Sequence, residues 1–340
     1  MDITTGFFWV DTLIKVLVAV AIVLGLALPV IYAELKIMAH MQNRVGPYYA
    51  GGRFGWAQPI ADGLKFVQKE DLVPAEADAT VFKIAPYVVV MATVAVFVVI
   101  PFGPDLVARD LDLGAFYLLA ISSIGTLGVL MAGWSSANKY SLMGGLRAAA
   151  QLIAYELPLM LAVLAVVIQA GTMSLTGIVE AQGEPFVVGP ISVSLPYLLT
   201  GQIISFVIFV VAMVAELSRI PFDMPIAESE LTMGYVTEYS SVRFSMFFLG
   251  EYASLIALSL VVATLFLGGY YVPLVPDPWL NLVGPLAVFG KAAVIVFFVL
   301  WIRSTFPRLR EDQLQDLAWR WLIPLALVNI LVISFVKVAV

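Results

Sequence analysis

The sequence has 340 residues, of which 61% are hydrophobic and only 12% are charged, and its formal net charge at pH 7 is -6. Because a soluble domain is typically about half apolar and about a quarter charged, this composition excludes a soluble globule and indicates a protein that crosses a membrane several times. The chain has no cysteine and one histidine, His40, so disulfides, thiolate-held iron–sulfur clusters and haem bound by paired histidines are excluded.

Apolar runs long enough to cross a bilayer, which takes about 20 helical residues, recur along the chain. They are centred near Val20, Val94, Thr126, Val163, Ile208, Ile256, Val296 and Ile330. Helices satisfy their own backbone hydrogen bonds in lipid, and none of these runs alternates as a barrel strand does. We therefore predict an all-α fold, a helical bundle with eight transmembrane helices that forms one integral membrane domain over residues 1–340.

The first predicted helix is longer than a bilayer requires. Its apolar stretch Leu13–Tyr32 continues through a helical mixture of residues to Met41 and stops at Arg44-Val45-Gly46-Pro47. A helix that outruns the bilayer tilts or projects, so we expect a long, tilted first helix. Residues 1–11 lack the basic region and cleavage site of a signal peptide, and we expect this helix to be retained.

A different kind of helix is predicted over residues 59–70. Pro59 suits the first turn of a helix, and Ile60, Leu64 and Val67 share one apolar face. This pattern is typical of an amphipathic helix that lies along the membrane interface. An ordinary surface helix of a cytoplasmic loop fits the same pattern.

Three charged residues, Glu156, Glu251 and Lys291, lie inside later apolar runs. A charge at this depth costs several kcal/mol and by default faces a polar interior or a pathway. Glu34, Glu156, Glu216 and Glu251 all lie toward the predicted cytoplasmic halves of their helices, so they could line one acidic funnel. The competing interpretation of each carboxylate is a hydrogen-bonded packing residue.

Residues 216–243 form a loop with an unusual charge balance, in which Glu216, Asp223, Glu228, Glu230 and Glu238 stand against Arg219 and Arg243. Fourteen of the 18 basic residues fall in alternate connections: Lys36, Arg44, Arg53, Lys65, Lys69, Lys83, Lys139, Arg147, Arg219, Arg243, Arg303, Arg308, Arg310 and Arg320. The positive-inside rule then places the acidic loop in the cytoplasm and both termini on the extracytoplasmic side, which requires an even number of spans. Acids gathered at a membrane face typically handle cations or protons.

Several stretches of the chain are distinctive. The loop 215–231 reads AELSRIPFDMPIAESEL and is followed by Gly-Tyr at 234–235 and Thr-Glu-Tyr at 237–239. Further motifs are Arg44-Val45-Gly46-Pro47, residues 58–65, Lys69-Glu70-Asp71, residues 139–142, Leu146-Arg147-Ala148, Tyr155-Glu156 and Trp301-Ile302-Arg303. Jointly these motifs, which extend over nearly the whole chain, closely resemble the H subunit of NADH-quinone oxidoreductase, the respiratory complex I membrane protein called subunit 1 in mitochondria.

The resemblance implies a subunit at the joint between the electron-transfer arm and the proton-pumping arm of that complex. It implies a quinone tunnel, entered from the membrane between the first and sixth helices and the interfacial helix. Residues that would form the tunnel or its supporting loop are Arg44, Phe66, Arg219, Asp223, Met246 and Phe247. Residues that would relay protons in an acidic chamber are Glu34, Asp62, Glu156, Glu216, Glu228, Glu230, Glu238 and Glu251.

The resemblance also implies which groups the chain meets. Quinone is expected as substrate, while FMN and iron–sulfur clusters belong to partner subunits, and we expect no metal site in this chain, which also lacks a phosphate loop and a dinucleotide fingerprint. The expected partners are peripheral-arm iron–sulfur and quinone-site subunits, small membrane subunits, antiporter-like subunits and membrane lipid, but not nucleic acid. We expect the bacterial plasma membrane as location, and catalysis by the assembled translocase but not by the isolated chain.

Two departures and three alternatives complete the interpretation. Leu35 follows Glu34 where members of the family generally have Arg, and the turn from Tyr48 to Arg53 is altered. Related subunits occur in ferredoxin-linked and hydrogenase-linked complexes. From the residues alone, a free-standing proton or cation transporter and a membrane anchor for a peripheral enzyme also remain open.

Overall fold

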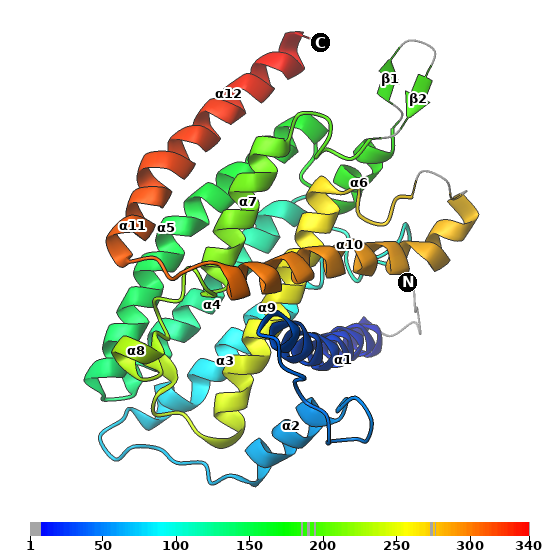
Figure 1. Cartoon of the computed structure of the whole chain (residues 1–340). Coiled ribbons are helices and arrows are strands. Elements are labelled where there is room, and N and C mark those ends of the chain that lie inside the picture. The colour runs from blue at the N-terminus through cyan, green and yellow to red at the C-terminus, as the bar shows by residue number, and fades with distance from the viewer. Residues whose placement is uncertain are drawn as a thin grey trace.

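The computed structural model of the chain describes residues 8–184, 186–188, 191–193, 195–272, 275 and 277–339. Its long helices pack side by side as a bundle (Figure 1). They are α1 (Phe8–Met41), α3 (Ala79–Val96), α4 (Gly114–Ser135), α5 (Lys139–Ala170), α7 (Ile203–Glu216), α9 (Ser241–Phe266), α10 (Asp277–Thr305) and α12 (Ile323–Ala339). The short elements are α2 (Gln58–Gln68), α6 (Leu175–Gly183), β1 (Phe186–Val188), β2 (Ile191–Val193), α8 (Glu228–Leu231), η1 (Gly234–Val236), α11 (Glu311–Asp316) and the π-helical turn η2 (Leu317–Leu322).

Seven helices within the described residues are long and apolar enough to cross a membrane. The last of them runs from Glu311 to Ala339 as one rod through α11, η2 and α12. The predicted span centred near Ile208, the fifth in chain order, corresponds to α7, which is apolar but only 14 residues long. The chain is therefore a multi-pass membrane protein with seven such helices and one shorter apolar helix.

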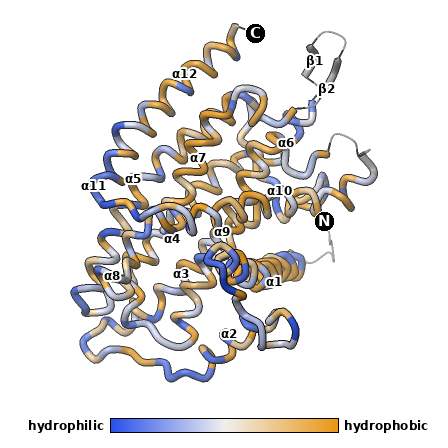
Figure 2. Tube along the Cα trace, viewed as in Figure 1, coloured by the Kyte–Doolittle hydropathy of each residue, from blue (hydrophilic) through white to orange (hydrophobic). Residues whose placement is uncertain are grey.

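Hydrophobic residues run along the long helices, whereas hydrophilic residues gather in the connections around α2, α8 and α11 (Figure 2). The helix α9 occupies the centre, because 72% of its apolar window is buried inside the chain, against 17% for α1 and 22% for the C-terminal rod. The main core consists of side chains from α5, α7 and α9, including Tyr155, Phe209 and Phe266. The outer helices thus leave apolar faces for lipid or partner subunits.

Two details differ from the sequence prediction. The second span was predicted around Val94, but α3 ends at Val96, because the apolar residues that follow form a turn before Pro101. The connection between α5 and α7 holds α6 and the antiparallel hairpin β1–β2, in which Phe186 pairs with Val193. Neither element was predicted. The helix predicted over 59–70 is present as α2, and its location along the membrane interface stays a prediction.

Helix α7 runs antiparallel to α5, and glutamines fasten the two helices. The side chain of Gln151 donates to the carbonyls of Ala215 (2.6 Å) and Phe222 (2.9 Å), while Gln202 donates to the carbonyl of Ala165 (3.0 Å). Both glutamines are buried, so these bonds satisfy the three carbonyl groups where water does not reach them. The first pair also positions the acidic loop, which leaves α7 at Glu216.

Candidate functional site

A buried cluster of ion pairs joins α1, α9, α10 and the acidic loop. The guanidinium of Arg219 lies 2.9 Å from Glu34 and 2.9 Å from Glu251, and its plane sits over the ring of Tyr252 at 4.8 Å. Arg303 contacts the other oxygen of Glu34. Glu34 and Arg219 are 4% and 3% exposed, so these charges are compensated by one another rather than by solvent.

A cavity of about 110 Å³ lies next to this cluster, between α3, α4, α5, α7 and α9. Two carboxylates line it, Glu216 from the end of α7 and Glu251 from the middle of α9. Hydroxyl groups complete its polar wall, and Thr93 and Ser254 are hydrogen-bonded to each other across it at 3.1 Å. Titratable and hydroxyl groups around a cavity inside a bundle are what a proton pathway requires.

Tyr235 adds a phenol to the same cavity wall from η1, outside the membrane-spanning helices. Burial raises the pKa of Tyr235, and the nearby Glu251 and Asp223 raise it further. The phenol therefore stays neutral at physiological pH and offers a hydrogen bond rather than a charge.

Glu156 stands beside the cavity rather than in its wall. Its carboxylate accepts a hydrogen bond from Ser123 of α4, whose neighbour Ser122 lines the cavity, as does Leu152 one helical turn before Glu156. The predicted funnel of Glu34, Glu156, Glu216 and Glu251 is therefore one neighbourhood in the fold, although only Glu216 and Glu251 face the same cavity.

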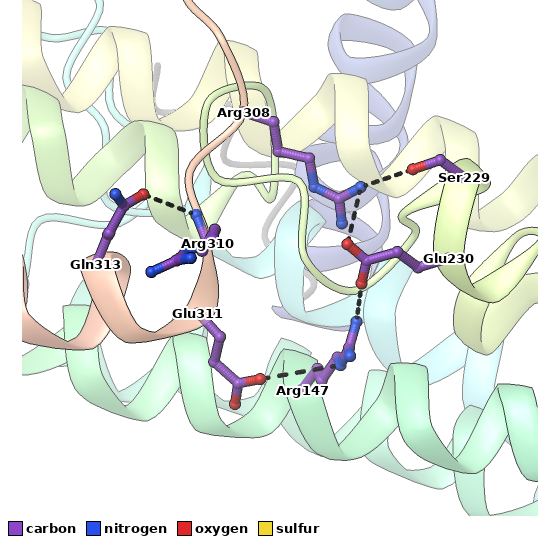
Figure 3. A network of polar contacts seen from close by, with 7 residues as sticks. All are labelled: Arg147, Ser229, Glu230, Arg308, Arg310, Glu311 and Gln313. Atoms are coloured by element: carbon purple, nitrogen blue, oxygen red, sulfur yellow. Dashed lines mark hydrogen bonds and ion pairs between the residues drawn. The ribbon is translucent and has the colours of Figure 1, made fainter.

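Glu230 lies in a separate network at the outer edge of the acidic loop (Figure 3). Its carboxylate accepts a hydrogen bond from Arg147 of α5 at 2.6 Å and lies 3.9 Å from Arg308, which precedes α11. The hydrogen bond from Arg147, with the charge of Arg308, holds the pKa of the Glu230 carboxyl below its usual value. The proton-relay role predicted for Glu230 stays a prediction, and these arginines favour the ionised form.

Two further predicted chamber residues, Asp62 and Glu238, do not line the cavity wall. Asp62 of α2 accepts from Gln58 (2.9 Å) and pairs with Lys65 (3.0 Å). Glu238 accepts from Asn138 in a different recess, near Glu76 and Lys139. The backbone of Glu228 begins α8, but its side chain lies outside the described residues.

The residues predicted for the quinone tunnel fall into two groups. Phe66 of α2 packs against Phe244 of α9, with ring centroids 5.4 Å apart, and Met246 lies two residues further along α9. Arg44 is exposed just beyond the end of α1. The second group lies toward the carboxylates: Arg219 in the ion-pair cluster, Asp223 half-buried in the acidic loop, and Phe247, which lines the cavity and packs against Tyr239.

Sequence reasoning missed the part that Arg303 and the hydroxyl residues play. Arg303 was noticed only as a basic residue near a helix end and as part of a family motif. A search for a second cation within reach of the buried Glu34 was the available signal. No comparable signal identifies Thr93 or Ser254, because hydroxyls are common in membrane helices.

Within the described residues, no group of three or more His, Cys, Asp and Glu side chains could hold a metal ion. The groups that the structure brings together at this site are carboxylates, arginines and hydroxyls, which can exchange protons or compensate charge.

Comparisons with known proteins agree along almost the whole chain. Residues 14–334 match the family described as NADH dehydrogenase. The second H subunit of NADH-quinone oxidoreductase from Syntrophobacter fumaroxidans is 46% identical over 339 residues, covering 97% of this chain and 96% of that protein. The H subunits of Syntrophotalea carbinolica (46% over 337 residues, 94% and 96% covered) and Geobacillus kaustophilus (43% over 318 residues, 93% and 91% covered) are similarly close.

Proposed function

Because this chain belongs to the NADH dehydrogenase family, as the membrane-embedded H subunit of NADH-quinone oxidoreductase, we propose that it forms the quinone tunnel of that complex and an acidic chamber. The chamber couples quinone reduction to proton translocation. The chain acts without a redox centre of its own, and partner subunits supply the electrons.

The observation that carries the proposal is the bridge made by Arg219. Nη1 of this guanidinium reaches Glu34 on α1, and its Nε reaches Glu251, which also lines the cavity with Glu216. A change of charge near Glu34 would therefore alter the interaction of Arg219 with Glu251. The proton affinity of the carboxylates that line the cavity would change with it. Such shared partners couple two sites through a free energy of interaction.

The tunnel is proposed where α1, α2 and α9 meet. Phe66 and Met246 would offer an apolar surface to an isoprenoid tail, while Arg44 marks the interface at which a headgroup enters. The loop that carries Arg219 and Asp223 would lie at the inner end of this path. The inner end of the proposed tunnel therefore meets the cluster of Glu34, Arg219 and Glu251.

The proposal is tested by Glu216→Gln in the assembled, purified complex. The amide keeps the shape of the side chain but cannot carry a proton, so quinone-linked turnover and proton pumping are expected to fall at least about a hundred-fold, the low end for a positioned proton-transfer group. NADH oxidation by an artificial acceptor at the electron-input arm is expected to stay unchanged. Unchanged quinone-linked turnover in this variant would refute the role of Glu216.

Glu180→Gln is the matched control, because Glu180 is an exposed carboxylate on α6, away from the cavity. It is expected to pump as the unmodified complex does. Ion flux through vesicles that contain the purified chain alone would instead support the transporter alternative. Co-purification with a ferredoxin-linked or hydrogenase partner would keep the chamber but change the electron donor.

A further inference from the structure

An apolar cleft that the proposed function does not use lies between α1, α10 and the segment that follows α3. Its volume is about 260 Å³. Side chains of α1 line it at every fourth position, Ile14, Val18 and Ile22, and Phe102 and Phe289 form the opposite wall with ring centroids 5.3 Å apart. Pockets that take a whole small molecule are usually roughly 300–1,000 Å³. A cleft below this range, drawn out for about 12 Å along a helix, fits a chain rather than a compact ligand.

A cation stands at one end of the cleft. Lys15 lines it and donates from Nζ to the carbonyl of Ala108 at 2.8 Å. The residue after Ala108 is Arg109, whose amide is fixed on the carbonyl of Val98. Lys15 lies about 7.5 Å of helix rise inside the start of the apolar span at Val10, a depth from which a lysine reaches the headgroup region.

The position of these two cations is unusual for the chain. Fourteen of its 18 basic residues lie in the connections of the opposite membrane face, and Arg109 alone lies in the intervening connections. The fold nevertheless places Lys15 beside an apolar cleft and on the carbonyl of Ala108, the residue directly before the exposed Arg109. Two nearby carboxylates are engaged elsewhere, since Asp110 accepts from Ser174 (2.9 Å) and Asp105 accepts from Asn281 (2.8 Å).

We propose that this cleft binds one acyl chain of an anionic phospholipid, with the lipid phosphate held by Lys15 and Arg109. The apolar wall supplies affinity for the chain, and the two cations select a negative headgroup over a zwitterionic one. The site lies at the membrane face where α1 begins, whereas Glu34 and the carboxylate cavity lie toward the other end of the same helix. The inference therefore holds or fails independently of the proposed proton chamber.

The test uses the purified complex in vesicles that contain a trace of photoreactive lipid. A phosphatidylglycerol and a phosphatidylcholine that carry the same diazirine acyl chain are compared, and adducts are located by mass spectrometry. Both probes are expected to label residues 14–22 and 97–108. The phosphatidylglycerol probe is expected to label them at least about five-fold more strongly, as one juxtamembrane cation provides. Equal labelling by the two probes would overturn the selection by charge.

Variants separate the chain from the headgroup. Ala19→Phe fills the cleft, since Ala19 is a buried lining residue, and labelling by both probes is expected to be lost. Lys15→Gln is expected to remove about five-fold of the preference for phosphatidylglycerol while phosphatidylcholine labelling stays constant. Asp11→Asn removes the carboxylate one helical turn before Lys15 and is expected to raise that preference, whereas a fall would overturn the assignment of the anion to Lys15.

Matched controls lie on the same membrane face. Leu17→Phe enlarges a lipid-facing residue of α1 outside the cleft, and Lys337→Gln removes an exposed cation from α12. Both are expected to label as the unmodified complex does. Undiminished labelling in Ala19→Phe would overturn the proposal. So would the absence of label in the cleft segments while α12 is labelled, because a partner subunit would then cover the cleft.

Discussion

Arg219 is surrounded by more negative charge than it can balance alone. It lies 2.9 Å from each of Glu34 and Glu251, and a second cation, Arg303, is needed to compensate Glu34. Buried ion pairs of this kind contribute little net stability when complete, but removal of one partner leaves an uncompensated charge. The cluster therefore acts as a unit, and the position of Glu251 in the cavity wall depends on it.

Arg219→Met tests this dependence. The variant leaves Glu251 and half of the charge of Glu34 without a partner, so we expect a loss of about 3–5 kcal/mol of stability, typical for one broken buried pair. It is measured as the yield and thermal unfolding midpoint of the purified complex. Arg310→Met is the control, because its pair with Asp312 is exposed and such pairs contribute about 0–1 kcal/mol. Equal effects of the two variants would show that the cluster is not compensated as described.

Glu230 offers a pH-dependent contrast to the buried cluster. Its folded-state pKa is lowered, chiefly by the hydrogen bond from Arg147, so its contribution to stability is complete above the ordinary value of about 4.3 and is lost as pH falls through the lowered value. The unfolding midpoints of the complex and of Glu230→Gln are therefore expected to differ by a constant amount from pH 8 to about pH 5. A difference that shrinks between pH 8 and pH 6 would instead mark Glu230 as a proton carrier near neutral pH.

The sequence indicates which carboxylates lie within apolar runs, but it does not indicate which cations they pair with. Glu156 and Glu251 stand out because a charge within an apolar run is costly, and that cost is visible in one dimension. The partners of Glu34 cannot be recognised in the sequence, since Arg219 and Arg303 lie far along the chain and contact Glu34 only after the helices pack. The separation of Glu230 from the cavity likewise depends on the contacts of Glu230 with Arg147 and Arg308, which position the acidic loop.

Helix α7 explains why hydropathy and helix length give different numbers of spans. Its 14 residues rise about 21 Å, short of a hydrocarbon core of about 30 Å. For α7 to cross, the turns before and after the helix, in which Tyr197 and Leu217 are buried, would have to cover the remainder. Irregular backbone is tolerated at membrane depth where protein surrounds it. An apolar run in the sequence can therefore be longer than the hydrogen-bonded helix that it contains.

The packing of α5 against α4 and the acidic loop depends on glycines. A Cβ atom on Gly144 would lie 2.6 Å from the backbone nitrogen of Tyr235, so the loop lies directly on the helix. We expect Gly144→Ala to cost about 1–3 kcal/mol through overpacking, and to reduce quinone-linked turnover because Tyr235 lines the cavity. Thermal unfolding and turnover of the purified complex measure the two effects.

Gly290→Ala is the matched control, because a Cβ atom there meets nothing within 4 Å. Alanine also favours a helix over glycine by about 1 kcal/mol, so this variant is expected to be neutral or slightly stabilised. If Gly144→Ala behaved in the same way, the close approach of the loop to α5 would not be a constraint on the site.

At the scale of the whole molecule, the direction of each helix follows from how often the chain crosses the membrane. The positive-inside prediction requires an even number of crossings, and seven long helices satisfy it only if α7 also crosses. The hydrogen bonds of Gln151 and Gln202 hold α7 antiparallel to α5. This arrangement favours a crossing by α7, because α5 is itself long enough to span the membrane. Both termini would then lie on the extracytoplasmic side, and the acidic loop would face the cytoplasm.

The absence of native cysteine makes this arrangement directly testable, since a single introduced thiol is the only one in the chain. Leu199→Cys and Ser229→Cys place exposed thiols before and after α7, and Tyr49→Cys places one in the connection after α1. We expect a membrane-impermeant maleimide to label the first from right-side-out vesicles only, and the other two from everted vesicles only. Labelling of Leu199→Cys and Ser229→Cys from the same side would mean that α7 does not cross and that the two ends of the chain lie on opposite faces.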